Sequence, residues 1–285
     1  MLNDDYLLMG LDGLSRAHEG DYFRDGHLSS SVIAAYYLCH ENSLDNRVQN
    51  AVKSHIDQEL RNDVLFLATP TQDPDTSLVE HLLSTLSAGV SDLREVGHNV
   101  IFAAAALKAF QSLPHAITPF RVDGISKLLA AFSTTQNVVV DKSDEIPESP
   151  AEMELIEFIF REYLRSVAQY AGHGQGWAGH LLTFGHAVIE LSRLGYPELG
   201  SRAHQAYRMY IKTMRRGPKE TDRHIPEHAR SSLTPLDHEY WEQMKSVRSG
   251  LGHALKYPYS FYNLIAKLEN LELRQTCLME AYRIF

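Results

Sequence analysis

The stretch Gly97-His-Asn-Val-Ile-Phe-Ala-Ala-Ala-Ala-Leu107 decides the fold, because its pattern of glycine, histidine and an apolar helical run returns three times. The further copies occupy residues 26–38, 179–189 and 252–257. Intervals of 71, 82 and 73 residues separate the four histidines, His27, His98, His180 and His253. Each interval is long enough for two or three helices. The sequence therefore predicts a repeated helical module that brings the four histidines to one end of the molecule.

Apolar residues recur at helical spacing through most of the chain. Ile156, Ile159 and Tyr163, for example, share one face of a predicted helix. The short strand-like runs at 64–68 and 138–140 are isolated, so they build no sheet. We therefore predict an all-α fold: one domain over residues 1–285, a helical array resembling an α/α toroid. Pro-rich or acidic segments predict surface loops near 136–149 and 215–235.

Composition excludes several classes of protein. The 27 basic and 36 acidic residues give a net charge of −9, which opposes binding to nucleic acid or to an anionic membrane surface. No apolar run is long enough to cross a bilayer. Cys39 and Cys277 lie apart among apolar residues, as buried thiols do in a reducing compartment, so we expect a soluble cytoplasmic protein. A homo-oligomer is compatible with this composition.

Histidines follow glycine far more often than chance allows. Six of the fifteen do so, where independent placement gives about one. A glycine lets the backbone turn sharply or pack closely, so the next imidazole can point into a cavity and bind a metal or act near neutral pH. We expect His27, His98 and His180 to hold a divalent ion such as Fe, Zn or Mn. The alternative is that each imidazole merely ties helix ends together.

Two further groups of residues are candidates for a catalytic pocket. His253 and Lys256 lie one helical turn apart, which places an imidazole beside a cation suited to an oxygen anion. We predict His180, His253 and Lys256 as catalytic residues. Aromatic and polar side chains near the same segments provide the candidates for substrate binding, which are His186, Tyr257 and Trp177.

The order of these segments resembles the succession of His-led helices in questin oxidase-like proteins. The resemblance rests on four short patches, which begin at His27, His98, His180 and His253. It implies that these residues, together with His186 and Lys256, occupy the recurrent polar positions of that family. It also implies an oxidoreductase that acts on an aromatic or quinone-like small molecule.

Other chemical signatures are missing from the sequence. No phosphate-binding Walker loop, hydrolase nucleophile elbow or complete dinucleotide fingerprint is present. The leading expectation is therefore an oxidoreductase with a His-lined pocket that uses a metal or O₂. Two alternatives stay open: a non-catalytic helical scaffold that presents a concave surface, and a metal-assisted lyase or hydrolase that uses the same residues.

Overall fold

The all-α prediction is confirmed by the computed structural model, which describes residues 2–135, 138–244 and 248–285. Within these ranges no strand forms. The helices of the described residues are α1 (Asp4–Arg16), α2 (Tyr22–Glu41), α3 (Asn46–Glu59), α4 (Val79–Ser87), α5 (His98–Ser112), α6 (Pro119–Ala131), α7 (Glu152–Gln169), α8 (Gly176–Arg193), α9 (Pro197–Met214), α10 (His238–Gln243), α11 (Arg248–Ile265) and α12 (Leu271–Glu280).

Helix α7 illustrates how the apolar spacing produces this structure. Ile156, Ile159 and Tyr163 recur every three or four residues, and all three are fully buried. Glu152 and Glu154 lie in its first turn, where their charge favours the positive end of the helix dipole. The helix packs against α8 and α12. Burial of its apolar stripe, rather than helix propensity alone, fixes its place.

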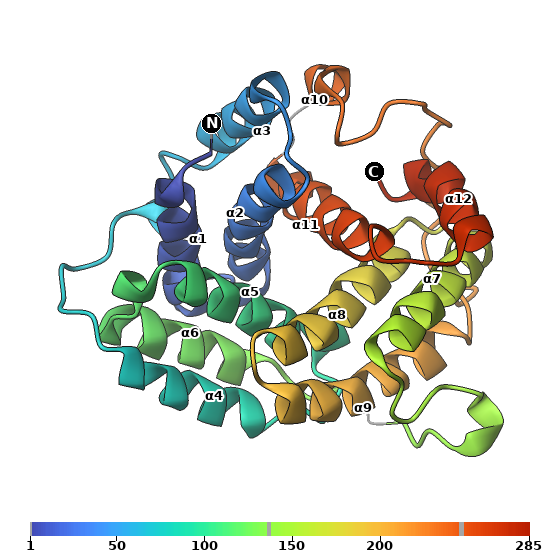
Figure 1. Cartoon of the computed structure of the whole chain (residues 1–285), viewed down its shortest axis with the longest axis horizontal. Coiled ribbons are helices and arrows are strands. Elements are labelled where there is room, and N and C mark those ends of the chain that lie inside the picture. The colour runs from blue at the N-terminus through green and yellow to red at the C-terminus, as the bar shows by residue number, and fades with distance from the viewer. Residues whose placement is uncertain (1, 136–137, 245–247) are drawn as a thin grey trace.

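Four helices form a closed ring at the centre of the molecule. Helix α2 packs on α5, α5 on α8, α8 on α11, and α11 again on α2. These are the helices that carry the four Gly-His steps. In Figure 1 they lie toward the middle, and α1, α6, α9 and α7 are among the helices that pack around them. The repeated module therefore places its four copies side by side around one axis.

Close packing between neighbouring helices explains the glycines of these steps. A Cβ atom at Gly97 would overlap the ring of Phe184 on α8, and one at Gly179 would overlap the ring of Tyr257 on α11. Gly97 also has φ +90°, the left-handed conformation that begins α5. Gly179 instead lies inside its helix, so there the absent side chain provides space rather than a turn.

The segments predicted as loops contain no α-helix in their described parts. From 138 to 151 the only regular element is the short 3₁₀ helix Lys142–Asp144, and Gln136 and Asn137 lie outside the described residues. Residues 215–235 form turns and extended backbone. The strand-like run at 64–68 contains the 3₁₀ helix Val64–Phe66. None of the described helices has the length and apolar character needed to cross a membrane.

Candidate metal centre

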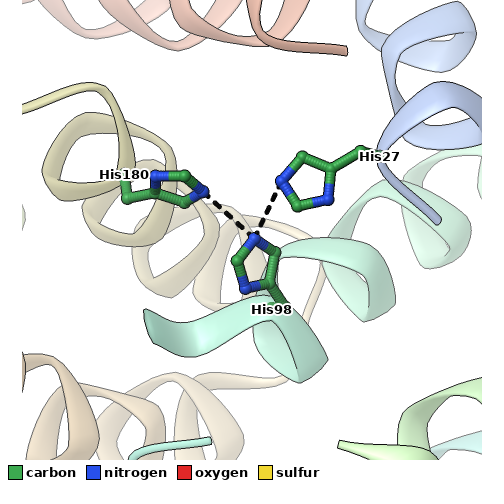
Figure 2. A group of neighbouring side chains, drawn as sticks. All are labelled: His27, His98 and His180. Carbon is green, nitrogen blue, oxygen red and sulfur yellow. Dashed lines mark hydrogen bonds between the residues drawn. The ribbon is translucent and has the colours of Figure 1, made fainter. Parts of the chain in front are cut away.

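Three imidazoles from three different helices meet at one point. His27 of α2, His98 of α5 and His180 of α8 are all buried, and their ligand nitrogens lie within 4.8 Å of one another. Nε2 of His98 is 3.0 Å from Nε2 of His27 and 3.1 Å from Nε2 of His180. Figure 2 shows the three rings pointing toward one another. We call these three residues the histidine triad.

Backbone carbonyls fix the orientation of each ring. Nδ1 of His27 lies 2.8 Å from the carbonyl oxygen of Phe23, and Nδ1 of His180 lies 2.5 Å from that of Gly176. Nδ1 of His98 bonds the carbonyl of Glu95 in the same way. Because a carbonyl only accepts, each Nδ1 carries the hydrogen, and the neutral ring presents a bare lone pair at Nε2. Metal-binding histidines are held by this pattern of outer hydrogen bonds.

The surroundings of the triad keep its imidazoles uncharged. Burial, followed by the charges of Lys256 and the neighbouring imidazoles, lowers the pKa of His27. Burial and the neighbouring His180 and Lys256 likewise lower the pKa of His98, and burial with Lys256 lowers that of His180 to about 4. Neutral rings leave no proton for a hydrogen bond between two Nε2 atoms. A shared cation satisfies all three lone pairs at once.

Two of the three spacings in the triad match those of a small divalent ion. In a tetrahedral site with Zn–N bonds of about 2.0–2.1 Å, neighbouring ligand nitrogens lie about 3.3 Å apart, close to the 3.0 and 3.1 Å that separate Nε2 of His98 from the other two Nε2 atoms. Within the described residues the cluster contains three imidazoles and no carboxylate. Imidazole ligands suit zinc, iron, copper and nickel. Three protein ligands leave a fourth position free for a substrate or a water molecule.

His253 completes a ring of four imidazoles without joining the triad. Its ring centroid lies 5.0 Å from that of His27 and 5.1 Å from that of His180, and it stacks on Tyr257 at 4.7 Å. Its buried Nε2 has no hydrogen-bond partner in the described structure. Burial and the charge of Lys256 lower its pKa to about 2. His253 is therefore a neutral imidazole beside the triad, with one ring nitrogen free to bond a ligand.

Lys256 separates the triad from a cavity on the ring axis. The lysine side chain is 4% exposed, and burial lowers its pKa to about 7. Its Nζ lies 5.3 Å from the centroid of the Phe102 ring, and the described residues provide it with no hydrogen-bond acceptor or carboxylate. The cavity has a volume of about 40 Å³.

The cavity repeats the register of the four inner helices. Its wall is formed by residues that lie three, six and seven positions after the histidine of each Gly-His step, and ten positions after the first three of these histidines. The layer nearest the triad contains the residues three positions after each histidine, which are Ser30, Ile101, Thr183 and Lys256. The next layers are mainly apolar and small, and they include Ile33, Ala34, Ala104 and Ala187.

The far layer of the cavity is charged. Lys108 forms ion pairs with Glu41 at 2.5 Å and with Glu190 at 3.1 Å, and it donates to the hydroxyl of Tyr259 at 2.8 Å. Glu190 also lies 3.2 Å from Nε2 of His186. Lys108 lies ten residues after His98, and Glu190 lies ten residues after His180. This shared spacing is the signal in the sequence that could have predicted the charged layer, and the Gly-His pattern alone does not include it. These charges are paired, unlike that of Lys256.

The structure places the predicted site residues in three positions. His27, His98 and His180 form the triad, and His253, Lys256 and Tyr257 lie against it, with the Tyr257 hydroxyl 3.2 Å from Nδ1 of His180. His186 lines the axial cavity beyond Lys256. Trp177 is 36% exposed and packs on Tyr170 and Tyr210, so it lines neither the axial cavity nor the outer pocket that His253 and Tyr257 line.

Comparisons with protein-family models, curated proteins and solved structures find no match to this chain. The assignment of a function therefore rests on the geometry of the triad and on the cavity beside it.

Proposed function

We propose that this protein is a metal-dependent oxidoreductase that acts on a small aromatic or quinone-like molecule. The observation that supports it best is the meeting of three neutral Nε2 lone pairs, each fixed by a carbonyl bond to its Nδ1. A divalent cation is the partner that satisfies all three lone pairs together. An iron or manganese ion bound there supplies the redox chemistry, with O₂ as the electron acceptor.

The residues around the free position have separate roles in this proposal. His253 accepts a hydrogen bond from a substrate hydroxyl through its unpartnered Nε2. Lys256 stabilises the oxyanion that forms when that hydroxyl loses its proton. His180 acts as a metal ligand rather than as a base, because both of its nitrogens are already committed, one to the triad and one to Gly176. The rings of Phe23, Phe102 and Phe132 pack on His98 and keep the centre dry.

The first experiment measures metal content. Metal-free protein is loaded separately with Fe(II), Mn(II) or Zn(II), and we expect one ion per chain for wild type. His98→Gln removes one ligand and should reduce the metal affinity at least tenfold. His204→Gln is the matched control, since His204 is also buried and has a lowered pKa but lies on α9 outside the triad. A wild-type chain that binds no ion refutes the proposal and favours the scaffold alternative.

The second experiment tests the reaction. Iron- or manganese-loaded protein should consume O₂ in the presence of a hydroxylated naphthoquinone, and His253→Gln should lower the rate without lowering the metal content. A second candidate, metal-assisted hydrolysis or lyase chemistry, is favoured by the ligand set itself, because three neutral histidines are also the set that activates a zinc-bound water. This second candidate would be supported if the zinc form hydrolysed 4-nitrophenyl acetate and the iron form consumed no O₂.

A further inference from the structure

The metal end of the axial cavity has an excess of positive charge. The triad contributes three neutral imidazoles, so a bound divalent ion keeps its full charge, and Lys256 lies beside it. No carboxylate belongs to the cluster in the described residues. The buried carboxylate of the cavity, Glu190, lies at the far end and is already paired with Lys108 and His186. Burying such charge without a counterion is costly.

Lys256 itself lacks a partner for its ammonium group. The side chain is 4% exposed, and the described structure gives its Nζ only the face of Phe102 at 5.3 Å. It is a wall residue of the cavity and faces the same space as Ser30 and Thr183. Buried lysines are ordinarily paired. A ligand with an anionic oxygen supplies the missing partner to the lysine.

The rest of the cavity defines the body of that ligand. Beyond Lys256 the wall is formed mainly by Ile33, Ala34, Ala104 and Ala187, which offer apolar contacts and few hydrogen bonds. The layers from Lys256 to Lys108 span seven helical residues, or about 10 Å at a rise of about 1.5 Å per residue. The far layer is closed by ion pairs that already satisfy one another. This narrow space suits a short, slender apolar group.

We propose that the cavity binds a monocarboxylate with a short apolar body, its carboxylate held by Lys256 and its body lying along the ring axis. This inference goes beyond the proposed function, because it rests on Lys256 and the cavity and not on the metal. The lysine contact belongs to the protein alone, so carboxylate binding persists in the metal-free chain.

The test compares acids with their neutral amides. Binding of hexanoate, benzoate, hexanamide and benzamide is measured by calorimetry on metal-free and on zinc-loaded full-length protein. We expect each acid to bind ten- to a hundredfold more tightly than its amide in both forms, the range for a charge-assisted hydrogen bond. Equal affinities of acid and amide would overturn the inference. A failure of the proposed function is distinguishable, since it appears as the absence of bound metal while the preference for the acid remains.

Two variants separate the head of the ligand from its body. Lys256→Met keeps the length of the side chain and should abolish the preference for the acid, whereas the matched control Lys127→Met, at an exposed lysine of α6, should retain it. Ala105→Leu adds a larger side chain at a partly exposed position of the cavity wall. It should weaken the binding of hexanoate at least tenfold and leave the binding of acetate unchanged. If Lys256→Met fails to fold, the Ala105→Leu result decides: equal loss of acetate and hexanoate, or loss of neither, refutes the placement of the body.

Discussion

The ring of Tyr257 on α11 occupies the space that a Cβ atom at Gly179 of α8 would fill. The Tyr257 hydroxyl lies 3.2 Å from Nδ1 of His180, the residue after Gly179. The absence of one side chain thus allows a neighbouring helix to press an aromatic ring against a ligand of the triad. The contact of Tyr257 with α8 therefore both packs the two helices together and positions a hydroxyl beside His180.

Gly179→Ala should destabilise the protein by about 1–2 kcal/mol, because the overlap with Tyr257 outweighs the gain in helix propensity. The matched control is Gly176→Ala in the first turn of the same helix, where an added Cβ meets nothing within 4 Å. That variant should be neutral or more stable by up to about 1 kcal/mol. Urea unfolding midpoints measure the stability of the two variants. Equal midpoints would contradict the prediction, because they would show that the Tyr257 ring moves aside without cost.

Metal binding should stabilise the folded chain. Zinc at a hundred times its dissociation constant adds about 2.7 kcal/mol, which raises the melting temperature by about 5–10 °C for a chain of this size. His98→Gln should abolish the shift and His204→Gln should preserve it, as measured by calorimetric scans with and without zinc. If zinc raised the melting temperature of both variants equally, the ion would be bound outside the triad.

Acid should destabilise the metal-free protein from about pH 6.5 downward. Burial and the charge of Arg208 lower the pKa of His204 to about 4 in the folded state, against 6.5 when exposed. Between these values the unfolded chain binds a proton that the folded chain does not, so stability is lost as the pH falls. His204→Gln should reduce the slope by up to about 1.4 kcal/mol per pH unit. Urea midpoints from pH 7.5 to 4.5 provide the slope, and an unchanged slope contradicts the prediction.

Glu190 should stabilise the far end of the cavity. Burial raises its pKa, but the close approach of His186 and the charges of His186 and Lys108 outweigh burial and lower the pKa to about 2. Glu190→Gln should therefore cost about 2–3 kcal/mol at pH 7, with a difference that shrinks as the pH falls from 4.5 toward 2. Asp123→Asn, which removes an exposed ion pair with Lys127, should cost under about 0.5 kcal/mol. If Glu190→Gln and Asp123→Asn lowered the free energy of unfolding equally, the buried contacts of Glu190 would contribute no more than an exposed ion pair.

The helical class and the meeting of the histidines follow from features that are local in sequence. Apolar spacing predicts helices such as α7, and the recurrence of a Gly-His step at similar intervals places His27, His98 and His180 in equivalent positions of successive inner helices. Equivalent positions around a closed ring must face the same axis. The sequence does not show that the steps at Gly26, Gly179 and Gly252 lie inside helices, because the need for space comes from a neighbouring helix.

The charged layer and the axial cavity could not be predicted in this way. A lone Lys108 or Glu190 within an apolar helix usually indicates a solvated edge, and only the closed ring brings the two within 3.1 Å. Trp177 shows the opposite case. It is an aromatic residue near the third Gly-His step and a candidate for substrate binding, yet its ring packs on Tyr170 and Tyr210 near the surface. Its role in substrate binding stays a prediction.

The contact between Gly252 and His27, where an added Cβ would lie 3.1 Å from that of the histidine, joins the last inner helix to the first. During synthesis, α2, α5 and α8 leave the ribosome before α11 exists. The growing chain therefore contains all three imidazoles of the triad before the fourth inner helix is made. A metal ion bound as proposed would find these ligands open on the side that α11 later covers.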